Sequence, residues 1–322
     1  MIERLAQFAP VLVGFALSAV AGFAFLRLLP RWQFNQVAYE DAPATHQQKT
    51  GTPTMGGLCF VVALLPLGAL GAPGDATRAL LFVALACGGI GFIDDYLSIR
   101  RGKNLGLRAR TKYLATALVA IAFLQLLDAD ARVPVDVILH TSSFALTVPH
   151  WFWLLLGIVA VTGTAHAMNL TDGLDGLATG VALPPLIVFA FAGIAAHVGG
   201  TYVVAALLIG GCLGFLLYNR HKAKMFMGDT GSLLLGGAIA GLAIASGQML
   251  LLIIVCFVPV CETLSVILQV TYFKATKGRR IFKMTPIHHH FELLGWPETR
   301  VTATFWTASA IASAIGYWIA GR

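Results

Sequence analysis

The chain has 322 residues, of which 57% are hydrophobic and only 11% are charged, and its mean hydropathy is +0.79. Soluble domains carry about 25% charged residues, so this composition excludes an ordinary water-soluble protein. The net charge of +7 comes from Lys and Arg residues scattered along the sequence. A nucleic-acid-binding domain would gather them into a basic face, so we expect no nucleic-acid partner.

Ten apolar runs follow one another along the chain, each close to the length that spans a bilayer. A bilayer core about 30 Å thick needs about 20 apolar residues in a helix. Lipid offers the backbone no hydrogen-bond partners, so the runs are predicted to be helices. We therefore expect one all-α integral membrane domain over residues 1–322, with about ten transmembrane helices. Their approximate limits are 8–29, 54–72, 79–97, 111–128, 150–167, 174–196, 201–219, 231–247, 249–271 and 301–320.

The first run has a second interpretation, a cleaved signal peptide, because "AVAG" at residues 19–22 resembles a cleavage site. The apolar stretch nevertheless continues to Leu29, which is too long for the apolar core of a signal peptide. We expect a helix that is retained.

The basic residues are distributed unevenly over the connections between the runs. Of the 22 Lys and Arg residues, 18 flank the first, third, seventh and ninth connections. Positively charged loops stay on the cytoplasmic side of a membrane. The asymmetry predicts that these four connections are cytoplasmic and that both termini are periplasmic.

Carboxylates gather on the same inner side, in otherwise apolar sequence. A charged side chain deep in a bilayer costs about 2.5–3.5 kcal/mol on insertion scales, so acids in a chain with so few charges indicate function. We therefore expect an active site on the cytoplasmic face. The acids concerned are Asp94, Asp95, Asp172, Asp175, Asp229, Glu292 and Glu298.

The segment "GFIDDYLSIRRGKNLGLRARTKYL" places Asp94 and Asp95 at the inner end of the third run and Lys112 at the start of the fourth. Adjacent carboxylates repel each other and favour a shared cation, either Mg²⁺ or a neighbouring basic side chain. The alternative is a structural helix end in which the acids pair with Arg100 and Arg101.

The segment "NLTDGLDGLATG" follows the fifth run and holds Asn169, Asp172 and Asp175 at a spacing of three residues. If the segment is helical, these side chains share one face and form three ligating groups in register. The alternative is a polar turn between two helices.

The segment "FMGDTGSL" opens the eighth run with Asp229. A helix begins here on the inner side, and its free N–H groups suit a phosphate. The alternative for Asp229 is a simple N-cap. Phe226 is an aromatic residue in a polar connection, where it either stacks on a base or packs against lipid headgroups.

Two further stretches carry weaker signals. Lys49 and Thr54 lie in "KTGTPTMGG" and could contact phosphate, although the spacing of the Walker motif is missing. The ninth run contains Glu262 and, nearer the cytoplasmic side, Gln269. For Glu262 a functional role and a structural role are equally plausible.

The segment "KMTPIHHHFELLGWPE" contains three consecutive histidines, His288, His289 and His290. Neighbouring side chains on a helix point about 100° apart, so one metal ion cannot easily bind all three. The surrounding loop is cationic, which suits an anionic substrate better than a metal. The alternative is a structural network of hydrogen bonds.

Acids that bind Mg²⁺, helix starts that suit phosphate and a membrane setting together predict phosphoryl transfer between a lipid phosphate and a nucleotide conjugate. CDP-alcohol phosphotransferases use DxxDGxxAR followed by two further acids. Residues 172–176 supply DxxDG, but Thr179 and Gly180 stand at the Ala-Arg positions, and no acid occurs between Asp175 and Asp229. That class is therefore rejected.

The motifs quoted above, together with "GGLCF", resemble in their order the polyprenyl-phosphate N-acetylhexosamine-1-phosphate transferases. The histidine segment resembles the branch that uses a muramoyl-pentapeptide donor. The resemblance implies a multi-pass protein of the bacterial inner membrane, often a homodimer. It would use Mg²⁺ to join UDP-MurNAc-pentapeptide to undecaprenyl phosphate.

Carried over by motif, the resemblance also implies roles for individual residues. Asp229 would be the main Mg²⁺ ligand, assisted by Asp94 and Asp95, with Asp94 the candidate base and His289 in a catalytic role. The substrate-binding residues would be Lys49, Thr54, Lys112, Asn169, Asp172, Asp175, Phe226, Gln269, His288 and His290.

Two alternatives stay open. A sister transferase with another sugar donor would share most of the motifs. A secondary transporter would also have about ten helices and membrane acids, but its site would lie near the bilayer midplane.

Overall fold

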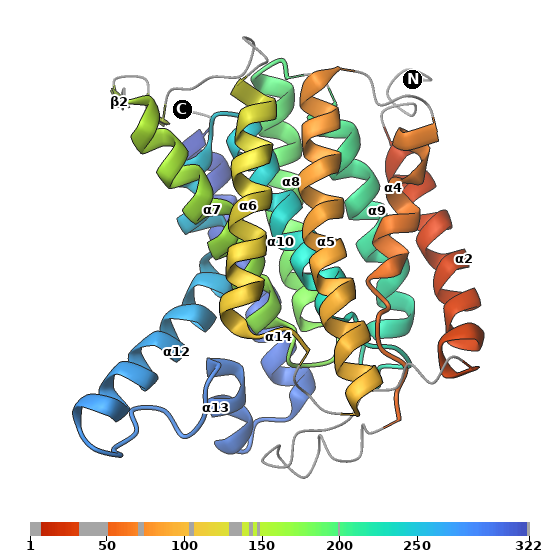
Figure 1. Ribbon diagram of the computed structural model, residues 1–322, viewed down its shortest axis with the longest axis vertical. Helices are drawn as coiled ribbons and strands as arrows, with labels where there is room; N and C mark the ends of the chain where they lie inside the picture. Colours follow the sequence, from red (N-terminus) through yellow and green to blue (C-terminus); the bar gives the residue numbers. More distant parts are fainter. Residues whose placement is uncertain are drawn as a thin grey trace.

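The computed structural model describes residues 8–31, 51–69, 74–102, 106–128, 137–141, 144–146, 149–198 and 200–320. Long helices run side by side, and α10 (Gly228–Ala245) lies among α5 (Asp75–Arg101), α7 (His150–Thr171) and α8 (Leu177–Ala195) (Figure 1). The surrounding helices are α2 (Ala9–Arg31), α4 (Leu58–Ala69), α6 (Ala109–Asp128), α9 (Thr201–Asn219) and α14 (Glu298–Ala320). The first apolar run forms α2 without interruption, and it packs against α9 and α4.

The central helix α10 is apolar on all sides, and every residue from Thr230 to Ala245 is buried. Such a helix is stable only inside a bundle. Its neighbours approach closely because small residues stand at the crossings. A Cβ atom at Gly91 of α5 would lie 2.1 Å from the carbonyl oxygen of Asp229, and one at Gly236 would lie 2.6 Å from Cα of Ala165 in α7.

Seven helices within the described residues are long and apolar enough to cross a membrane, and a bent pair brings the number to at most eight. These findings establish a multi-pass, helical membrane protein. Within the described part of the second predicted run, residues 54–69, the helix is α4, which has 12 residues. The tenth run falls within α14, which is not among the seven.

The ninth run, expected as one helix over 249–271, is broken. A 3₁₀ turn (η1, Met249–Leu251) and α11 (Leu252–Val255) meet α12 (Phe257–Ala275) at an angle of 79°. Pro259 lies in the first turn of α12, where a proline fits a helix start but cannot continue the preceding helix. Consequently α12 leaves the bundle obliquely, and the short helix α13 (Ile287–Leu293) lies beside it (Figure 1).

The expectation of a purely α-helical chain misses one short feature. Strands β1 (Val137–Thr141) and β2 (Phe144–Leu146) pair in an antiparallel hairpin between α6 and α7. Five and three residues are too few to show a convincing periodicity in the sequence. The sequence pattern therefore does not predict the hairpin.

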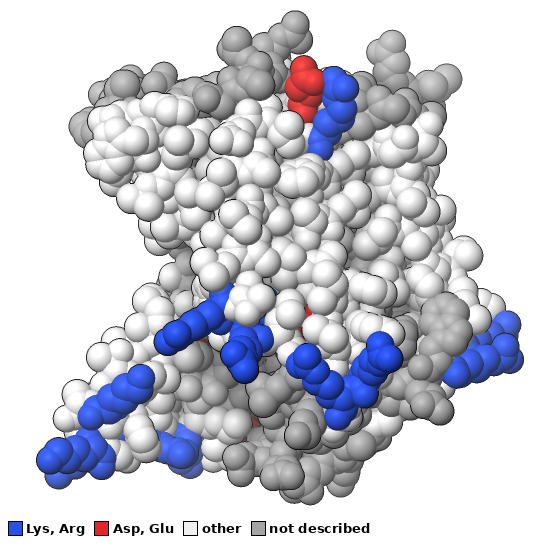
Figure 2. Space-filling model, viewed as in Figure 1, with Lys and Arg blue, Asp and Glu red and all other residues white. Residues whose placement is uncertain are grey.

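Basic side chains gather at one end of the molecule, where α12 projects (Figure 2). An exposed ion pair between Asp75 and Arg78 lies at the start of α5. This distribution matches the charge asymmetry on which the predicted orientation rests. The orientation itself, with both termini periplasmic, stays a prediction.

Candidate active site

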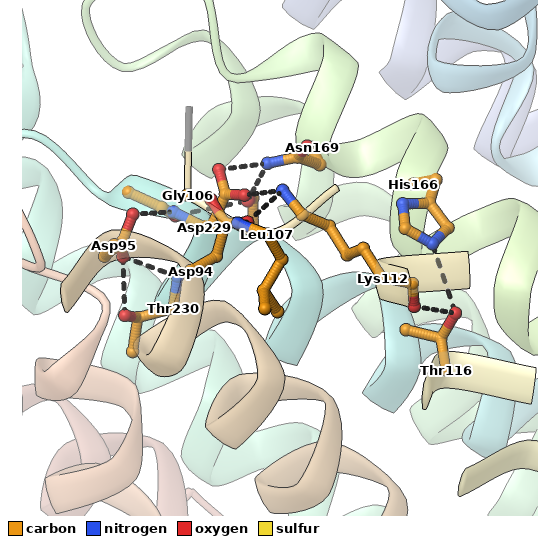
Figure 3. Close-up of polar contacts among 12 residues, drawn as sticks. Asp94, Asp95, Gly106, Leu107, Lys112, Thr116, His166, Asn169, Asp229 and Thr230 are labelled. Carbon is orange, nitrogen blue, oxygen red and sulfur yellow. Dashed lines mark hydrogen bonds and ion pairs between the residues drawn. The ribbon is translucent and has the colours of Figure 1, made fainter. Parts of the chain in front are cut away.

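Lys112 stands at the centre of the site, between two acids. Its Nζ atom lies 3.0 Å from Oδ1 of Asp94 and forms a second ion pair with Oδ2 of Asp229 (Figure 3). The three residues come from α6, α5 and α10, and their side chains are only 11–21% exposed. One ammonium group thus bridges two carboxylates that are distant in the sequence.

Asp95 caps helix α10 from outside that helix. Its Oδ1 accepts the backbone N–H of Asp229 at 3.0 Å, and its Oδ2 accepts the backbone N–H and the hydroxyl of Thr230 at 2.9 and 2.6 Å. Carboxylates are favoured at helix N-termini by the free N–H groups and the helix dipole. The N-terminus expected to receive a phosphate is therefore occupied by Asp95.

Asp94 is held by the loop that follows α5. Its Oδ1 accepts the backbone N–H of Leu107 at 2.8 Å, and Arg101 in turn donates to the carbonyl oxygen of Gly106 at 2.7 Å. The alternative in which the acid pair is neutralised by Arg100 and Arg101 is not what is observed for Asp94, because its ion pair is with Lys112. Arg101 instead fixes the loop.

Asn169, in the last turn of α7, supports Asp229. Its Nδ2 atom donates to Oδ1 of Asp229 at 2.6 Å and to Oγ of Ser232 at 3.0 Å. Both oxygens of Asp229 are therefore engaged, one by Asn169 and the other by Lys112. The arrangement fixes the orientation of this carboxylate (Figure 3).

Asp172 lies just beyond α7 and belongs to the same group of acids. Burial and, to a smaller extent, the charges of Asp229 and Asp95 raise its pKa to about 8, although a hydrogen bond from the backbone of Gly228 lowers it. We call Asp94, Asp95, Asp172 and Asp229 the acid cluster. Its crowding is electrostatically unfavourable, because like charges disfavour ionisation of one another.

The expectation that Asn169, Asp172 and Asp175 share one helical face is wrong. Helix α7 ends at Thr171, and Asp172 has φ −81° and ψ 51°, outside the helical region. The chain turns there, so Asn169 and Asp172 approach the acid cluster while Asp175 meets other partners. Asp175 accepts the backbone N–H of Ala223 at 2.9 Å and donates its own N–H to Glu298 at 2.7 Å.

The weak motif around Thr54 joins the site through backbone pairing. Phe226 donates its N–H to the carbonyl oxygen of Pro53 and accepts the N–H of Gly56, both at 2.8 Å. A Cβ atom at Gly228 would lie 3.1 Å from Oγ1 of Thr54. The segment from Pro53 to Gly56 and the segment around Phe226 thus lie side by side and form one wall of the site. The side chain of Phe226 is half-buried. Lys49 lies outside the described residues.

The three histidines have three different partners. His288 is fully buried, and its Nδ1 lies 3.0 Å from Oε1 of Glu262, which is also fully buried. His289 Nδ1 lies 2.7 Å from Oε2 of Glu292, and His290 Nδ1 accepts the backbone N–H of Lys283 at 3.1 Å. Glu262, undecided from sequence, therefore joins α12 to α13 through His288.

Gln269 holds the loop that leads to the histidines. Its Oε1 accepts the N–H groups of Ile281 and Phe282 at 2.9 and 3.0 Å, and its Nε2 donates to the carbonyl oxygen of Phe282 at 3.2 Å. The buried amide therefore shapes the segment between α12 and α13. Its predicted contact with substrate stays a prediction.

Sequence reasoning missed a neighbour of Lys112. His166 of α7 is buried, its Nε2 lies 3.1 Å from Oγ1 of Thr116, and its ring stacks on Tyr113 at 3.8 Å. Thr116 also donates to the carbonyl oxygens of Lys112 and Tyr113. The available signal was a polar residue inside an apolar run, one turn from Asn169.

The donor set of the acid cluster fits a hard divalent cation. Carboxylate and amide oxygens are the ligands that Mg²⁺ prefers in proteins. Of the four carboxyl groups in the acid cluster, those of Asp94 and Asp229 contact the ammonium of Lys112, and a dication would offset further negative charge. Asp94 and Asp229 already share one cation, the ammonium of Lys112.

The sequence matches the model of one protein family. The family described as glycosyl transferase family 4 matches residues 77–247, a range that includes all four residues of the acid cluster. The chain belongs to this family.

Similar curated proteins carry a more particular name, phospho-N-acetylmuramoyl-pentapeptide-transferase. The relative from Desulforudis audaxviator is 43% identical, covering 94% of this chain and 95% of its own length. That from Desulforamulus reducens is 42% identical, covering 94% and 92%. The relative from Halalkalibacterium halodurans is 40% identical, covering 99% and 98%.

Proposed function

We propose that the chain transfers phospho-MurNAc-pentapeptide from UDP-MurNAc-pentapeptide to undecaprenyl phosphate, which gives lipid I and UMP in peptidoglycan biosynthesis. The observation that carries the proposal is the identity of about 40% over nearly the whole chain with relatives named for this transfer. The acid cluster at the charged end of the bundle supports it, because phosphoryl transfer depends on positioning and electrostatics.

The reaction we propose needs one new bond and breaks one. An oxygen of the lipid phosphate forms a bond to the β-phosphorus of the donor, and the bond from that phosphorus to the bridging oxygen breaks, so that UMP leaves. The acceptor phosphate is already ionised at neutral pH. Asp94, the candidate base, therefore has little proton transfer to perform.

Asp229, Asp94 and Asp95 are the proposed Mg²⁺ ligands. Mg²⁺ would supply charge neutralisation at the pyrophosphate. Asp95 has three hydrogen-bond donors from α10, so its main contribution is to hold Asp229 in place. Lys112 is within reach of the same carboxylates, and we propose that its ammonium binds a substrate phosphate.

The donor is proposed to bind along the wall formed by the two paired motifs. Phe226 supplies an aromatic face for the uracil ring. Thr54 and Asn169 lie beside the acid cluster, to which Asp172 belongs. Asp175 anchors the segment before Phe226 through Ala223. The histidine segment, including the catalytic candidate His289, is proposed to contact the muramoyl-pentapeptide part, with Lys49 completing the site.

The acceptor is proposed to reach the site from the bilayer. An apolar cavity of about 260 Å³ opens between α7 and the bend of α11 and α12, and its lining includes Gly163, Ile253, Pro259 and Leu264. The cavity is open to the side of the bundle, where lipid would lie. A polyprenyl chain is the acceptor whose chemistry matches such a lining.

The membrane arrangement that accompanies this proposal is a bacterial inner-membrane protein with about ten spans, periplasmic termini and a cytoplasmic site, assembled as a homodimer. The basic end of the molecule supports the orientation (Figure 2). Cytoplasmic nucleotide donors would then reach the acid cluster directly.

The test is UMP release by purified protein in detergent, supplied with undecaprenyl phosphate, Mg²⁺ and UDP-MurNAc-pentapeptide. Parallel reactions contain UDP-GlcNAc as donor or EDTA. We expect release only with the muramoyl donor and none with EDTA. Release with UDP-GlcNAc alone would show that the chain is a transferase with another sugar donor. No release from folded protein would favour the alternative that the chain is a secondary transporter.

A further inference from the structure

Three potential metal ligands lie together outside the acid cluster. Asp175, His221 and Glu298 each offer one ligand atom, and these atoms lie within 4.8 Å of one another. They come from the turn between α7 and α8, from the segment after α9 and from the first residue of α14. The carboxylate side chains are 2% and 12% exposed, and the imidazole is 38% exposed.

The separations suit a tetrahedral metal ion better than direct hydrogen bonds. His221 Nδ1 lies 3.4 Å from Oδ2 of Asp175 and 3.6 Å from Oε2 of Glu298. An N–H···O hydrogen bond spans about 2.7–3.2 Å. Ligands on a tetrahedral Zn²⁺, with bonds of about 2.0–2.1 Å, are about 3.3 Å apart.

Backbone hydrogen bonds fix both carboxylates in this orientation. Asp175 is held by the N–H of Ala223 at 2.9 Å. Glu298 uses Oε1 to accept the N–H of Asp175 at 2.7 Å, while its Oε2 faces His221. Metal ligands are commonly oriented by such outer contacts.

An unpartnered hydroxyl lines the same place. Asp175 and His221 border a cavity of about 220 Å³, together with Arg220, Thr302 and Trp306. Thr302 is 8% exposed, and its Oγ1 has no hydrogen-bond partner. Buried polar atoms are rarely left unsatisfied, so this hydroxyl indicates a ligand in the cavity.

We propose that Asp175, His221 and Glu298 form a zinc site with three protein ligands and a bound water. Zinc sites with an open position have this composition, and the water would be the missing partner of Thr302. Arg220 also borders the cavity. The site joins the start of α14 to the segment that leads to Phe226. It shares Asp175 with the residues proposed to support the donor, so zinc retention is measured separately from UMP release.

The experiment measures zinc retention by the full-length protein in detergent. The protein is stripped with a chelator, incubated with ZnCl₂ and desalted, and bound zinc per chain is measured by mass spectrometry. Competition with a chromophoric chelator gives the affinity. Variants His221→Asn and Glu298→Gln remove one ligand each, and His197→Asn, at an exposed histidine beyond α8, is the matched control.

We expect wild type and the control to retain one zinc ion that both ligand variants lose, with affinity lowered more than about 100-fold, since losing even an outer contact costs about 10- to 100-fold. Co²⁺ in its place should show tetrahedral absorption that His221→Asn abolishes. Folding is checked by circular dichroism and gel filtration. Equal retention by wild type and both ligand variants, or none by folded wild type, would overturn the proposal.

Discussion

At the scale of single residues, the site depends on how each carboxylate is used. Both carboxylate oxygens of Asp95 accept hydrogen bonds from the N-terminus of α10, whereas Asp229 is oriented by Lys112 and Asn169. Adjacent acids in the sequence therefore have different roles in the structure. The role of each acid depends on which donors its oxygens contact, so Asp229 is the residue to substitute when the cation is tested.

The substitution Asp229→Asn should abolish turnover while the protein stays folded. An amide is nearly isosteric but cannot supply the charge that a cation needs, and losing several kcal/mol of electrostatic stabilisation lowers the rate at least about 1000-fold. The measurement is UMP release, with gel filtration as the check on folding.

Asp75→Asn is the matched control, because Asp75 is an exposed acid at the opposite end of α5 whose ion pair is with Arg78. This control should keep its activity. Near-normal turnover by Asp229→Asn would refute the assignment of Asp229 to the cation.

The substitution His289→Ala should impair turnover with the muramoyl donor about 10- to 100-fold, the loss expected for one hydrogen bond to a charged group. His289 is oriented by Glu292 at 2.7 Å. Steady-state kinetics with UDP-MurNAc-pentapeptide provide the measurement, and His150→Ala on the far end of α7 is the control. Unchanged kinetics would leave the histidines a structural role only.

At the scale of elements, the position of the site depends on how closely α5 and α10 cross. Asp94 and Asp95 lie one turn from Gly91 on α5, and Asp229 opens α10. The crossing brings the end of α5 over the start of α10, so the same contact that packs the helices also assembles the acids. Site geometry and helix packing are therefore linked.

The substitution Gly91→Ala should destabilise the protein, because the new Cβ would lie 2.1 Å from a backbone oxygen that cannot move aside. Overpacking of this kind costs about 1–3 kcal/mol, which lowers Tm by several degrees. Gly89→Ala on the same helix is the control, since a Cβ there meets no atom within 4 Å. Thermal unfolding in detergent should separate the two variants, and equal Tm values would contradict the close crossing.

At the scale of the whole molecule, charge distribution predicts the orientation in the membrane. Basic residues crowd the end that carries α12 and α13, and the other end holds the Asp75–Arg78 pair (Figure 2). Because positively charged loops stay on the cytoplasmic side of a membrane, we expect the basic end of the molecule to face the cytoplasm. The nucleotide donor of the proposed reaction is cytoplasmic, so function requires the same orientation.

Cysteine labelling in intact cells tests this orientation. A membrane-impermeant thiol reagent should label Asp75→Cys from outside and leave Lys277→Cys unlabelled until the cells are lysed. Four of the five native cysteines are buried, and the unsubstituted chain measures the background. The reverse labelling pattern would place the acid cluster on the periplasmic side and refute both the topology and the donor access.

The sequence alone determined the class of fold, because a composition of 57% hydrophobic residues leaves apolar helices in lipid as the stable arrangement. It also indicated the acids, since carboxylates in apolar sequence are rare without a function. Asp94, Asp172 and Asp229 were found in this way, and the contacts and charges of the structure bring them together.

Only the tertiary structure decided which partners these residues have. The 79° bend before α12, the use of Asp95 as a cap for α10 and the pairing of Glu262 with His288 join residues distant in sequence. The turn after Thr171, which directs Asp172 and Asp175 to different partners, is local but is fixed by contacts from α10 and α14. Periodicity and residue type describe one segment at a time, whereas hydrogen-bond partners depend on the packing of all segments together.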